Sequence, residues 1–303
     1  MHLIVTGGAG FIGNHIVRHL LDKGHSVEVI DNLHSGRMEN LESLENKIKF
    51  HKMDILEYDK LKNIVKNADG VFHEAALTVV QESFDKPEEY HMVNVVGTEN
   101  IFKLAKEFGF KVVYASSSSV YGNSESIPIR EDSKRKPLNP YGETKLQDEF
   151  LAEKYSSDGV TIIGLRYFNV YGRGQTSSYA GVITKFLERL REHQSPIING
   201  DGSQVRDFVY VEDVAKANLL AMEKKIDSSF INIGTGSITS ILDLAKMMID
   251  AANIQLKPIH AKPLNGDVKL SQADVSLAKK LLSWEAEMKL QDWLVKILGP
   301  KKS

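Results

Sequence analysis

Short apolar runs alternate with stretches of helical periodicity along the first part of the chain. Residues 2–6 form an apolar run, glycines follow, and Phe11, Ile16 and Leu20 belong to a helical pattern that ends at Gly24. Alternating strands and helices of this kind imply a parallel sheet with helices on both faces. The other runs that predict strands are residues 27–30, 48–53, 70–73 and 111–115.

The alternation becomes less regular beyond about residue 166. A helix is expected at residues 181–193 and a short apolar run at 196–198, before a mixed segment. Residues 211–222 and 230–234 again predict a helix and then a strand. We therefore expect a discontinuous boundary, with a first domain of residues 1–165 that is rejoined by about 207–235, and a smaller C-terminal α/β region of residues 166–206 and 236–303.

The composition is that of a globular protein with one large domain or two unequal ones. Of the 303 residues, 42% are hydrophobic and 26% are charged. Lys plus Arg number 38 and Asp plus Glu number 40, which gives a formal net charge of -2. Because no half of the chain carries a basic excess, nucleic acid is not an expected partner.

The residue types that are absent or scattered exclude several kinds of chemical site. There is no cysteine, so disulfides, thiolate metal sites and a cysteine nucleophile are excluded, which fits a reducing compartment. The ten histidines form no ligand-like cluster, so no metal is expected. No run approaches the ~18 apolar residues of a membrane span, and the glycine motif at Gly7 leaves no room for a secretory signal. We expect a cytoplasmic protein with no membrane partner.

Gly7, Gly10 and Gly13 stand at the junction of the first expected strand and the first expected helix. On spacing alone, this G-x-x-G-x-x-G pattern suits a structural turn as well as a phosphate site. At such a junction, a tight turn without side chains brings backbone N–H groups and a helix N-terminus against a pyrophosphate. The position therefore favours a dinucleotide site in a Rossmann-type, doubly wound parallel sheet.

Asp31 ends the second expected strand, about twenty residues after the glycines. A carboxylate at this place accepts hydrogen bonds from an adenosine ribose and repels a 2′-phosphate, which favours NAD over NADP. Two alternatives stay open, because Asp31 also suits the start of a turn with Asn32, and Arg37 nearby suits NADP. Asp54, after the third expected strand, suits a helix N-cap as well as an adenine contact.

Tyr141 and Lys145 lie four residues apart on a helix that we expect to open after Pro140, so both project from one face. A phenol, with a reference pKa of ~10, is a poor base at neutral pH, but a nearby ammonium favours the phenolate. Tyr141 can then exchange a proton with a substrate hydroxyl. Because Y-x-x-x-K is also common on surface helices, the neighbouring sequence has to show whether this pair is catalytic.

Four consecutive serines, residues 116–119, supply that context because they directly follow the expected strand 111–115. Ligands bind at the carboxyl ends of the strands in open parallel sheets. A hydroxyl from this cluster can hydrogen-bond the same oxygen that Tyr141 protonates and deprotonates. A flexible polar loop is the alternative, and the abutting strand weakens it.

Together, these motifs resemble the extended short-chain dehydrogenases/reductases of the NAD-dependent epimerase/dehydratase family, and most of all their UDP-glucose 4-epimerase branch. The resemblance covers nearly the whole chain and rests on the order and spacing of the motifs. The matching stretches are VTGGAGFIG at residues 5–13, DNL at 31–33, HEAA at 73–76, NVVGT at 94–98, PYGETK at 140–145, LRYFN at 165–169 and RDFVYV at 206–211.

The resemblance implies bound NAD and gives roles to individual residues. Ser117, Tyr141 and Lys145 match the catalytic set, Lys145 also contacts the nicotinamide ribose, and Phe168 lies near the nicotinamide. The residues expected to bind the cofactor are Gly7, Gly10, Phe11, Ile12, Gly13, Asp31, Asn32, Leu33, Ser35, Gly36, Asp54, Ile55, Ala75, Ala76, Asn94, Lys145 and Phe168. The residues expected to bind a UDP-sugar are Ser117, Tyr141, Asn169, Arg206, Asp267 and Ser271.

The two residues after Ser117 bear on the reaction. Related nucleotide-sugar dehydratases carry an Asp-Glu pair there, because water elimination needs another acid and base, whereas this chain has Ser118 and Ser119. The resemblance therefore predicts a 4-epimerase. The Tyr141 phenolate takes the 4-hydroxyl proton while hydride leaves C4 for NAD, and the 4-keto sugar rotates before hydride returns to its opposite face.

Two later positions bear on the substrate. Epimerases carry an Arg three residues before the Asp of an R-x-G-D segment, where this chain has Leu264 before Asp267. Leu264 cannot make that bidentate contact with a diphosphate, so either Lys262 compensates as a point charge or the donor is bound differently. Ser271 stands where bulky residues restrict some epimerases to plain hexoses. Because serine is small, we expect the UDP-N-acetylhexosamine pair to be admitted beside UDP-glucose and UDP-galactose.

Other activities stay open at this point. They are a UDP-glucuronate epimerase or decarboxylase, a keto-sugar reductase and, from a different class, a nucleotide-binding protein without turnover. The presence of Tyr141, Lys145 and Ser117 speaks against the last of these. Family members pair through the Tyr141 helix and the preceding one, about residues 87–108, so the resemblance also implies a homodimer.

Overall fold

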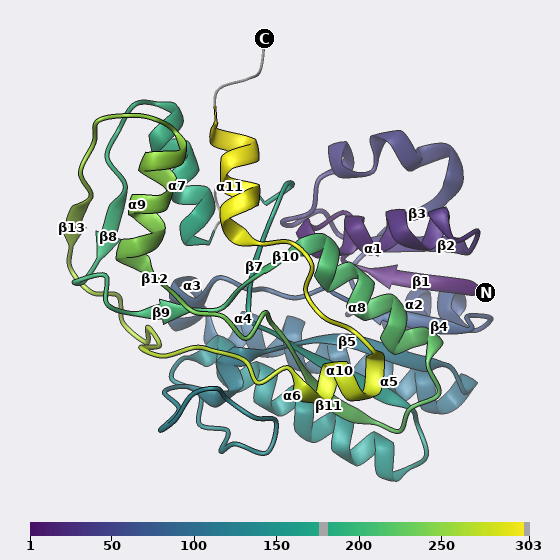
Figure 1. The fold of residues 1–303 in the computed structure, drawn as a ribbon. Coiled ribbons are helices and arrows are strands. Elements are labelled where there is room, and N and C mark those ends of the chain that lie inside the picture. Colours follow the sequence, from purple (N-terminus) through teal and green to yellow (C-terminus); the bar gives the residue numbers. More distant parts are fainter. Residues whose placement is uncertain (176–180, 300–303) are drawn as a thin grey trace.

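The computed structural model describes residues 1–175 and 181–299. Within these residues, seven parallel strands form the central sheet in the order β11-β6-β5-β4-β1-β2-β3 (Figure 1). The chain runs from β1 outward to β3 and then returns to β4 on the other side of β1. A change of direction of this kind opens a crevice at the carboxyl ends of the strands, where ligands bind. The strands are β1 His2–Thr6, β2 Ser26–Asp31, β3 Ile48–Lys52, β4 Gly70–His73, β5 Lys111–Ser117, β6 Ile162–Tyr167 and β11 Ser229–Ile233.

Helices cover both faces of this sheet, as the alternating pattern predicts. Apolar residues of α1, α8 and α10 pack on one face, and those of α2, α5 and α6 pack on the other. Buried side chains of α1, such as Ile16 and Leu20, recur at the predicted helical spacing. The doubly wound Rossmann-type sheet is therefore confirmed. The helices are α1 Phe11–Asp22, α2 Tyr58–Val65, α5 Gly97–Phe108, α6 Pro140–Ser157, α8 Val211–Glu223 and α10 Ser276–Leu282.

Two predicted elements differ from the structure in ways that matter for function. The strand expected at residues 111–115 continues through Ser116 to Ser117, so the serines begin within the strand rather than directly after it. The helix expected at residues 87–108 contains a π-helical turn. Its parts are α4 Pro87–Tyr90, the π-helix η3 His91–Val96 and α5. The extra residue per turn changes which side chains face inward at this place.

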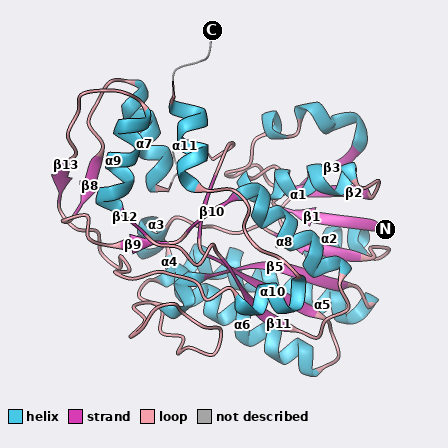
Figure 2. Cartoon of the chain, in the orientation of Figure 1, coloured by secondary structure: helices cyan, strands magenta, loops and turns pink. Residues whose placement is uncertain are grey.

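A second group of elements lies beside the carboxyl ends of the strands. Helices α7, α9 and α11 share one apolar core, and three two-stranded sheets pair β7 with β10, β8 with β13 and β9 with β12. Figure 2 shows the β8–β13 pair at the opposite side of the molecule from β1. The elements are β7 Asn169–Tyr171, α7 Val182–Arg191, β8 Ile197–Asn199, β9 Val205–Arg206, β10 Phe208–Tyr210, β12 Thr239–Ser240, α9 Ile241–Ala251, β13 Ile259–Ala261 and α11 Leu290–Leu298.

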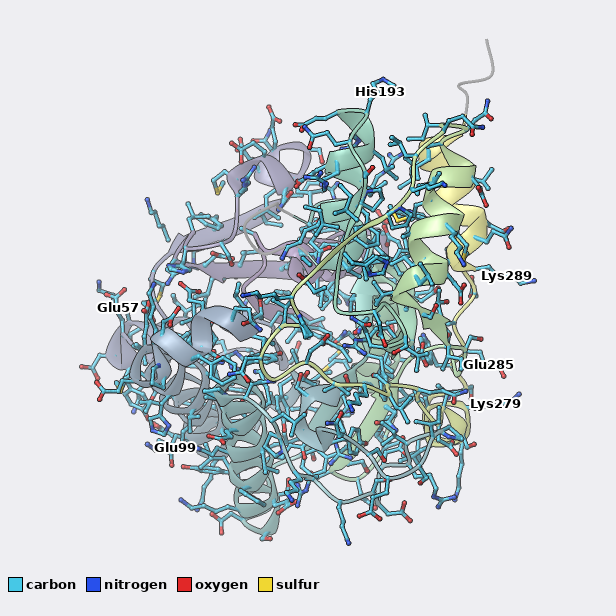
Figure 3. All side chains as sticks on the ribbon, turned by 90° about the vertical axis from the view of Figure 1, so that its left-hand side faces the viewer. Glu57, Glu99, His193, Lys279, Glu285 and Lys289 are labelled. Atoms are coloured by element: carbon cyan, nitrogen blue, oxygen red, sulfur yellow. The ribbon has the colours of Figure 1, made fainter. Side chains whose placement is uncertain are left out.

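Charged side chains cover the outside of these layers. His193, Glu285 and Lys289 project outward in Figure 3, and Lys279 pairs with Glu285 at 2.6 Å on the surface. None of the helices described between residues 1 and 299 is long and apolar enough to cross a membrane. The remaining short helices are η1 Met38–Asn40, η2 Glu42–Lys47, α3 Val80–Asp85 and η4 Ser118–Tyr121.

Candidate active site

The glycine turn between β1 and α1 leaves no space for side chains. Gly7 has a φ of +67°, and a Cβ there would lie 2.7 Å from the backbone nitrogen of Ala75. A Cβ on Gly13 would lie 2.2 Å from the carbonyl oxygen of Gly7. Gly10 is the N-cap of α1, and no side chain caps this helix. The first N–H groups of α1 therefore have no side-chain acceptor, and the turn fits a pyrophosphate group such as that of NAD.

A cavity of about 750 Å³ begins at this turn and extends to the second group of elements. Three of the predicted site residues, Leu33, Gly36 and Asn94, do not line it. The predicted residues that line it are Gly7, Gly10, Phe11, Ile12, Gly13, Asp31, Asn32, Ser35, Asp54, Ile55, Ala75, Ala76, Ser117, Tyr141, Lys145, Phe168, Asn169, Arg206, Asp267 and Ser271. The fold thus brings both expected ends of the site, cofactor and substrate, to one space.

Asp31 ends β2 and organises the loop that follows it. Its carboxylate accepts hydrogen bonds from the N–H of Ala9 at 3.0 Å and of Leu33 at 2.8 Å. A Cβ on Gly36 would lie 2.8 Å from both carboxylate oxygens. Burial raises the pKa of Asp31, although the two backbone hydrogen bonds oppose this. Leu33 and Gly36 therefore shape the surroundings of Asp31, and Arg37 lies outside the cavity lining.

Asp54 does not act as the N-cap of α2, because that position belongs to Glu57. The Asp54 carboxylate accepts hydrogen bonds from the Asn32 side-chain amide at 2.8 Å and from the N–H of Leu56 at 2.9 Å. Asp54 and Asn32 both line the cavity. The N-cap alternative is therefore wrong, and the adenine contact of Asp54 stays a prediction.

The proposed catalytic hydroxyls come from the end of β5 and the start of α6. Ser117 is the last residue of β5, and its Oγ accepts a hydrogen bond from the N–H of Ser119 at 3.1 Å. Asn139 caps α6 by accepting a hydrogen bond from the N–H of Gly142 at 2.8 Å. This cap fixes the first turn of α6, which contains Tyr141. Ser117 and Tyr141 consequently enter the same cavity from two rigid elements.

Lys145 follows on the same helix and is almost completely buried. Its Nζ lies 3.1 Å from Oδ2 of Asp148, and the two side chains are 3% and 0% exposed. Burial opposes the ammonium charge of Lys145, but Asp148, Tyr141 and Glu74 outweigh burial and raise the pKa of Lys145. Burial also raises the pKa of Asp148, to about 7. The sequence analysis missed Asp148, although its i+3 spacing from Lys145 was a usable signal.

Asn94 lies in the π-helical turn and faces the protein interior, outside the cavity lining. Its carboxamide accepts a hydrogen bond from the N–H of Leu77 at 2.8 Å and donates to the carbonyl of Leu77 at 3.0 Å. It also donates to Oγ1 of Thr144 at 3.0 Å. Asn94 is fully buried. Its side chain therefore holds the cavity-lining Leu77 in place, and the expected direct contact with the cofactor stays a prediction.

Glu74 is a cavity-lining residue that the sequence analysis did not single out. The Tyr167 hydroxyl donates to its Oε1 at 2.9 Å and accepts a hydrogen bond from the Asn218 amide at 2.7 Å. Its buried Oε2 has no hydrogen-bond partner among the described residues. Burial raises the pKa of Glu74 to about 8, although Tyr167 and Lys145 lower it. The burial of Glu74 could be recognised only from the folded structure, and not from the sequence.

The end of the cavity that is expected to hold the substrate contains a cation that is already paired. Arg206 in β9 donates from Nη2 to Oδ1 of Asp267. Burial lowers the pKa of Arg206, and Asp267 opposes this effect. Asn169 lines the same end, as does Leu264, which is 42% exposed. Lys262 does not line the cavity, so the compensation expected of it has no geometric support.

Comparisons with known proteins agree with this geometry. The model of the NAD dependent epimerase/dehydratase family matches residues 3–234. A relative described as a putative UDP-glucose 4-epimerase, from Methanocaldococcus jannaschii, is 38% identical over 306 residues, or 99% of this chain and 98% of the relative.

Two solved structures resemble this one over nearly their whole length. UDP-glucose 4-epimerase from Thermotoga maritima, with UDP-glucose, has a TM-score of 0.93 and 36% identity, and the match covers 97% of this chain and 96% of that one. UDP-N-acetylglucosamine 4-epimerase from Methanobrevibacter ruminantium M1, in complex with UDP-N-acetylmuramic acid, has a TM-score of 0.93 and 36% identity, and the match covers 98% of this chain and 96% of that one.

Proposed function

Because this chain belongs to the NAD dependent epimerase/dehydratase family, we propose that it is a nucleotide-sugar 4-epimerase. Its substrates are UDP-glucose and UDP-galactose, together with the corresponding UDP-N-acetylhexosamines. The observation that carries the proposal is the convergence of Ser117, Tyr141 and Lys145 on the cavity that also contains the glycine turn. The named activities of its relatives support the same reaction.

The chain's own residues supply the acid–base chemistry at the sugar. The phenolate of Tyr141 takes the proton of the 4-hydroxyl, and the Ser117 hydroxyl donates a hydrogen bond to the same oxygen. The ammonium of Lys145 interacts electrostatically with Tyr141 on the same helix. Bound NAD would supply the hydride acceptor and donor for C4. After the 4-keto sugar has rotated, Tyr141 gives its proton back to O4 and the configuration at C4 is inverted.

The residues after Ser117 favour epimerisation over dehydration. Ser118 and Ser119 line the cavity within η4, where dehydration would need an acid and a base. Serine hydroxyls do not perform that carboxylate chemistry at neutral pH. A proton at C5 therefore has no base at this position, and the keto sugar returns to a hexose.

We assign the cofactor to the sheet end of the cavity and the UDP-sugar to the other end. The N–H groups of α1 would hold the pyrophosphate of NAD, and the loop of Asp31 would hold its adenosine ribose. Asn169, Arg206 and Asp267 hold the sugar nucleotide. Ser271, buried and small, leaves space for an N-acetyl group. The proposed cofactor-binding domain consists of residues 1–165 together with about 207–235. The proposed substrate-binding domain consists of residues 166–206 and 236–303.

We further propose a homodimer that forms through α5, η3 and α6. These helices pack against one another, and they expose two large apolar side chains, Met92 in η3 and Phe150 in α6, to 47% and 51%. In Phe150→Glu, light scattering should show monomers where the unchanged protein shows dimers. Val295→Glu changes an equally exposed residue on α11 and should leave the dimer intact. A monomeric unchanged protein would refute this proposal.

The cysteine-free sequence still favours the cytoplasm, as a prediction.

The experiment that tests the proposed function is a turnover assay without added reductant. Purified protein is incubated separately with UDP-glucose, UDP-galactose, their N-acetyl counterparts and UDP-glucuronate, and the products are resolved by chromatography. We expect interconversion of the hexose pairs. In Tyr141→Phe, the rate of this interconversion should fall by a factor of ~10²–10⁴. Turnover of UDP-glucuronate alone would favour the alternative epimerase or decarboxylase. NAD binding without any turnover would overturn the proposal.

A further inference from the structure

A carboxylate is buried directly against the catalytic ammonium. Asp148 lies three residues after Lys145 on α6, so the two side chains share one face of the helix. The distance from Lys145 Nζ to Asp148 Oδ2 is 3.1 Å, and both side chains are shielded from water. The other oxygen, Oδ1, has no hydrogen-bond partner among the described residues. The ion pair with Lys145 is thus the principal interaction of Asp148.

A chain of hydrogen-bonded side chains lies between Asp148 and the centre of the sheet. The Thr98 hydroxyl on α5 lies close enough to lower the pKa of the Asp148 carboxyl. Thr98 Oγ1 is 2.9 Å from His73 Nε2, and His73 Nδ1 is 2.7 Å from Thr6 Oγ1. Burial and the charge of Lys145 lower the pKa of His73 to about 3, so its ring is neutral. A neutral ring donates to one threonine and accepts from the other, which fixes Thr98 beside Asp148.

Burying the Asp148 carboxylate carries a desolvation cost that an apolar side chain would not carry. Burial raises the pKa of Asp148 despite the nearby ammonium. Buried ion pairs are often no more stabilising than well-packed apolar side chains of similar volume. An acid at this position is therefore better explained by what it does for Lys145. Without a counter-charge, burial alone would lower the pKa of Lys145, and the ammonium would be lost as the pH rises.

We propose that Asp148 is a positioning residue that keeps Lys145 protonated and fixes its ammonium group for the interaction with Tyr141. Only the expected effect of Asp148 on turnover rests on the proposed function. The charge on Lys145 is set by contacts within the protein and exists without substrate. The titratable or charged groups that face this pair are Tyr141 and Glu149 from α6, His73 and Glu74 from the end of β4, and Tyr114 from β5.

The first test measures the titration of Lys145 directly. In protein labelled with ¹³C at lysine Cε, the Lys145 resonance, assigned by its absence in Lys145→Arg, should titrate above the ordinary lysine value of 10.5. In Asp148→Asn it should titrate at a lower pH than in the unchanged protein. Glu143→Gln removes an exposed carboxylate from the same helix and should not move the resonance. A Lys145 that titrates below 10.5 in the unchanged protein would overturn the proposal even if the variant does not fold.

The second test reads the consequence for turnover. In Asp148→Asn, kcat on UDP-galactose should fall on the alkaline side of the pH profile by about tenfold or more, since each pKa unit changes the ionised fraction tenfold. KM should change little, and Asp148→Glu should restore part of the alkaline activity. A merely structural role predicts lower stability with a pH profile that superimposes on that of the unchanged protein. If no donor is turned over at all, the proposed function fails, and the lysine titration still decides the role of Asp148.

Discussion

Arg166 in β6 and Glu149 in α6 form a buried bidentate ion pair. Arg166 donates from Nε to Oε1 at 2.7 Å and from Nη2 to Oε2 at 2.8 Å. Ser116, next to the proposed catalytic Ser117, donates to the same Oε1 at 2.7 Å. The pair therefore connects the helix that bears Tyr141 to the two strands whose ends form the floor of the site.

Removing one member of this pair should destabilise the protein strongly, and removing both should cost less than the two single losses added together. Arg166→Leu leaves a carboxylate buried without its main partner, and we expect the free energy of unfolding to fall by ~3–5 kcal/mol. The double variant Arg166→Leu with Glu149→Leu should lose less than the sum of the two single variants, because no unpaired charge is left. Denaturant titration measures each value. Additive losses would mean that the pair does not act as a unit.

Asp31 should control both the affinity for NAD and the discrimination against NADP. Hydrogen bonds that involve a charged group contribute ~1.5–3 kcal/mol, so Asp31→Ala should weaken NAD binding roughly 10- to 100-fold. The affinity for NADP should rise relative to that for NAD, because the repulsion of a 2′-phosphate is lost. Calorimetry with both cofactors checks this, with the exposed Asp22→Ala as control. An unchanged NAD-to-NADP ratio would contradict the role given to Asp31.

Leu264 should be the position that limits affinity for the diphosphate. It lines the cavity beside an Arg206 that Asp267 already pairs, so Leu264→Arg adds a cation where the family has one. We expect the Kd for UDP to fall by roughly tenfold, because a charged hydrogen bond contributes ~1.5–3 kcal/mol. Lys262→Ala should leave the Kd unchanged, since Lys262 lies outside the lining. A weaker binding of UDP in Lys262→Ala would show that this lysine does compensate.

Glu74 should make the protein less stable as the pH rises. Burial raises the pKa of Glu74 from 4.5 to about 8, so the folded protein keeps a proton that the unfolded chain releases. The contribution of Glu74 is fully present below about pH 4.5 and is lost as the pH rises through about 8. Each pKa unit corresponds to ~1.4 kcal/mol, so the loss amounts to a few kcal/mol at most.

Urea unfolding at pH 5 and pH 8.5 tests this dependence. In Glu74→Gln, the difference in unfolding free energy between the two pH values should shrink. Some dependence should persist because Asp148, whose pKa is also raised by burial, acts in the same direction. An equal pH dependence in both proteins would mean that Glu74 ionises normally in the fold.

Local patterns predicted the parts of the site that lie close together in sequence. The glycines, Asp31 and the pair Tyr141 and Lys145 each sit where a strand or helix of recognisable period begins or ends. Side chains whose role depends on distant packing were not predictable in this way. Asn94 faces inward from a π-helical turn, which the sequence periodicity did not predict. Arg206 meets Asp267 only because the chain returns past β9 sixty-one residues later.

Short strands of the second group were also missed. Strands β9 and β12 have two residues each, and β10 and β13 have three, which is too short for an alternating pattern to appear. Their pairing depends on contacts between distant segments. By contrast, β5 was found from its apolar run, but the two serines that complete it are polar and were placed directly after the strand.

The most direct test of the central claim follows the hydrogen atom at C4 of the sugar. UDP-glucose that carries deuterium at C4 is incubated with the purified protein in ordinary water, and the UDP-galactose formed is analysed by NMR and mass spectrometry. The proposed reaction predicts that deuterium stays at C4 of the product while the configuration is inverted, and that Tyr141→Phe forms almost no product. Inversion with loss of deuterium to the solvent, or the absence of inversion in protein that binds NAD, would contradict it.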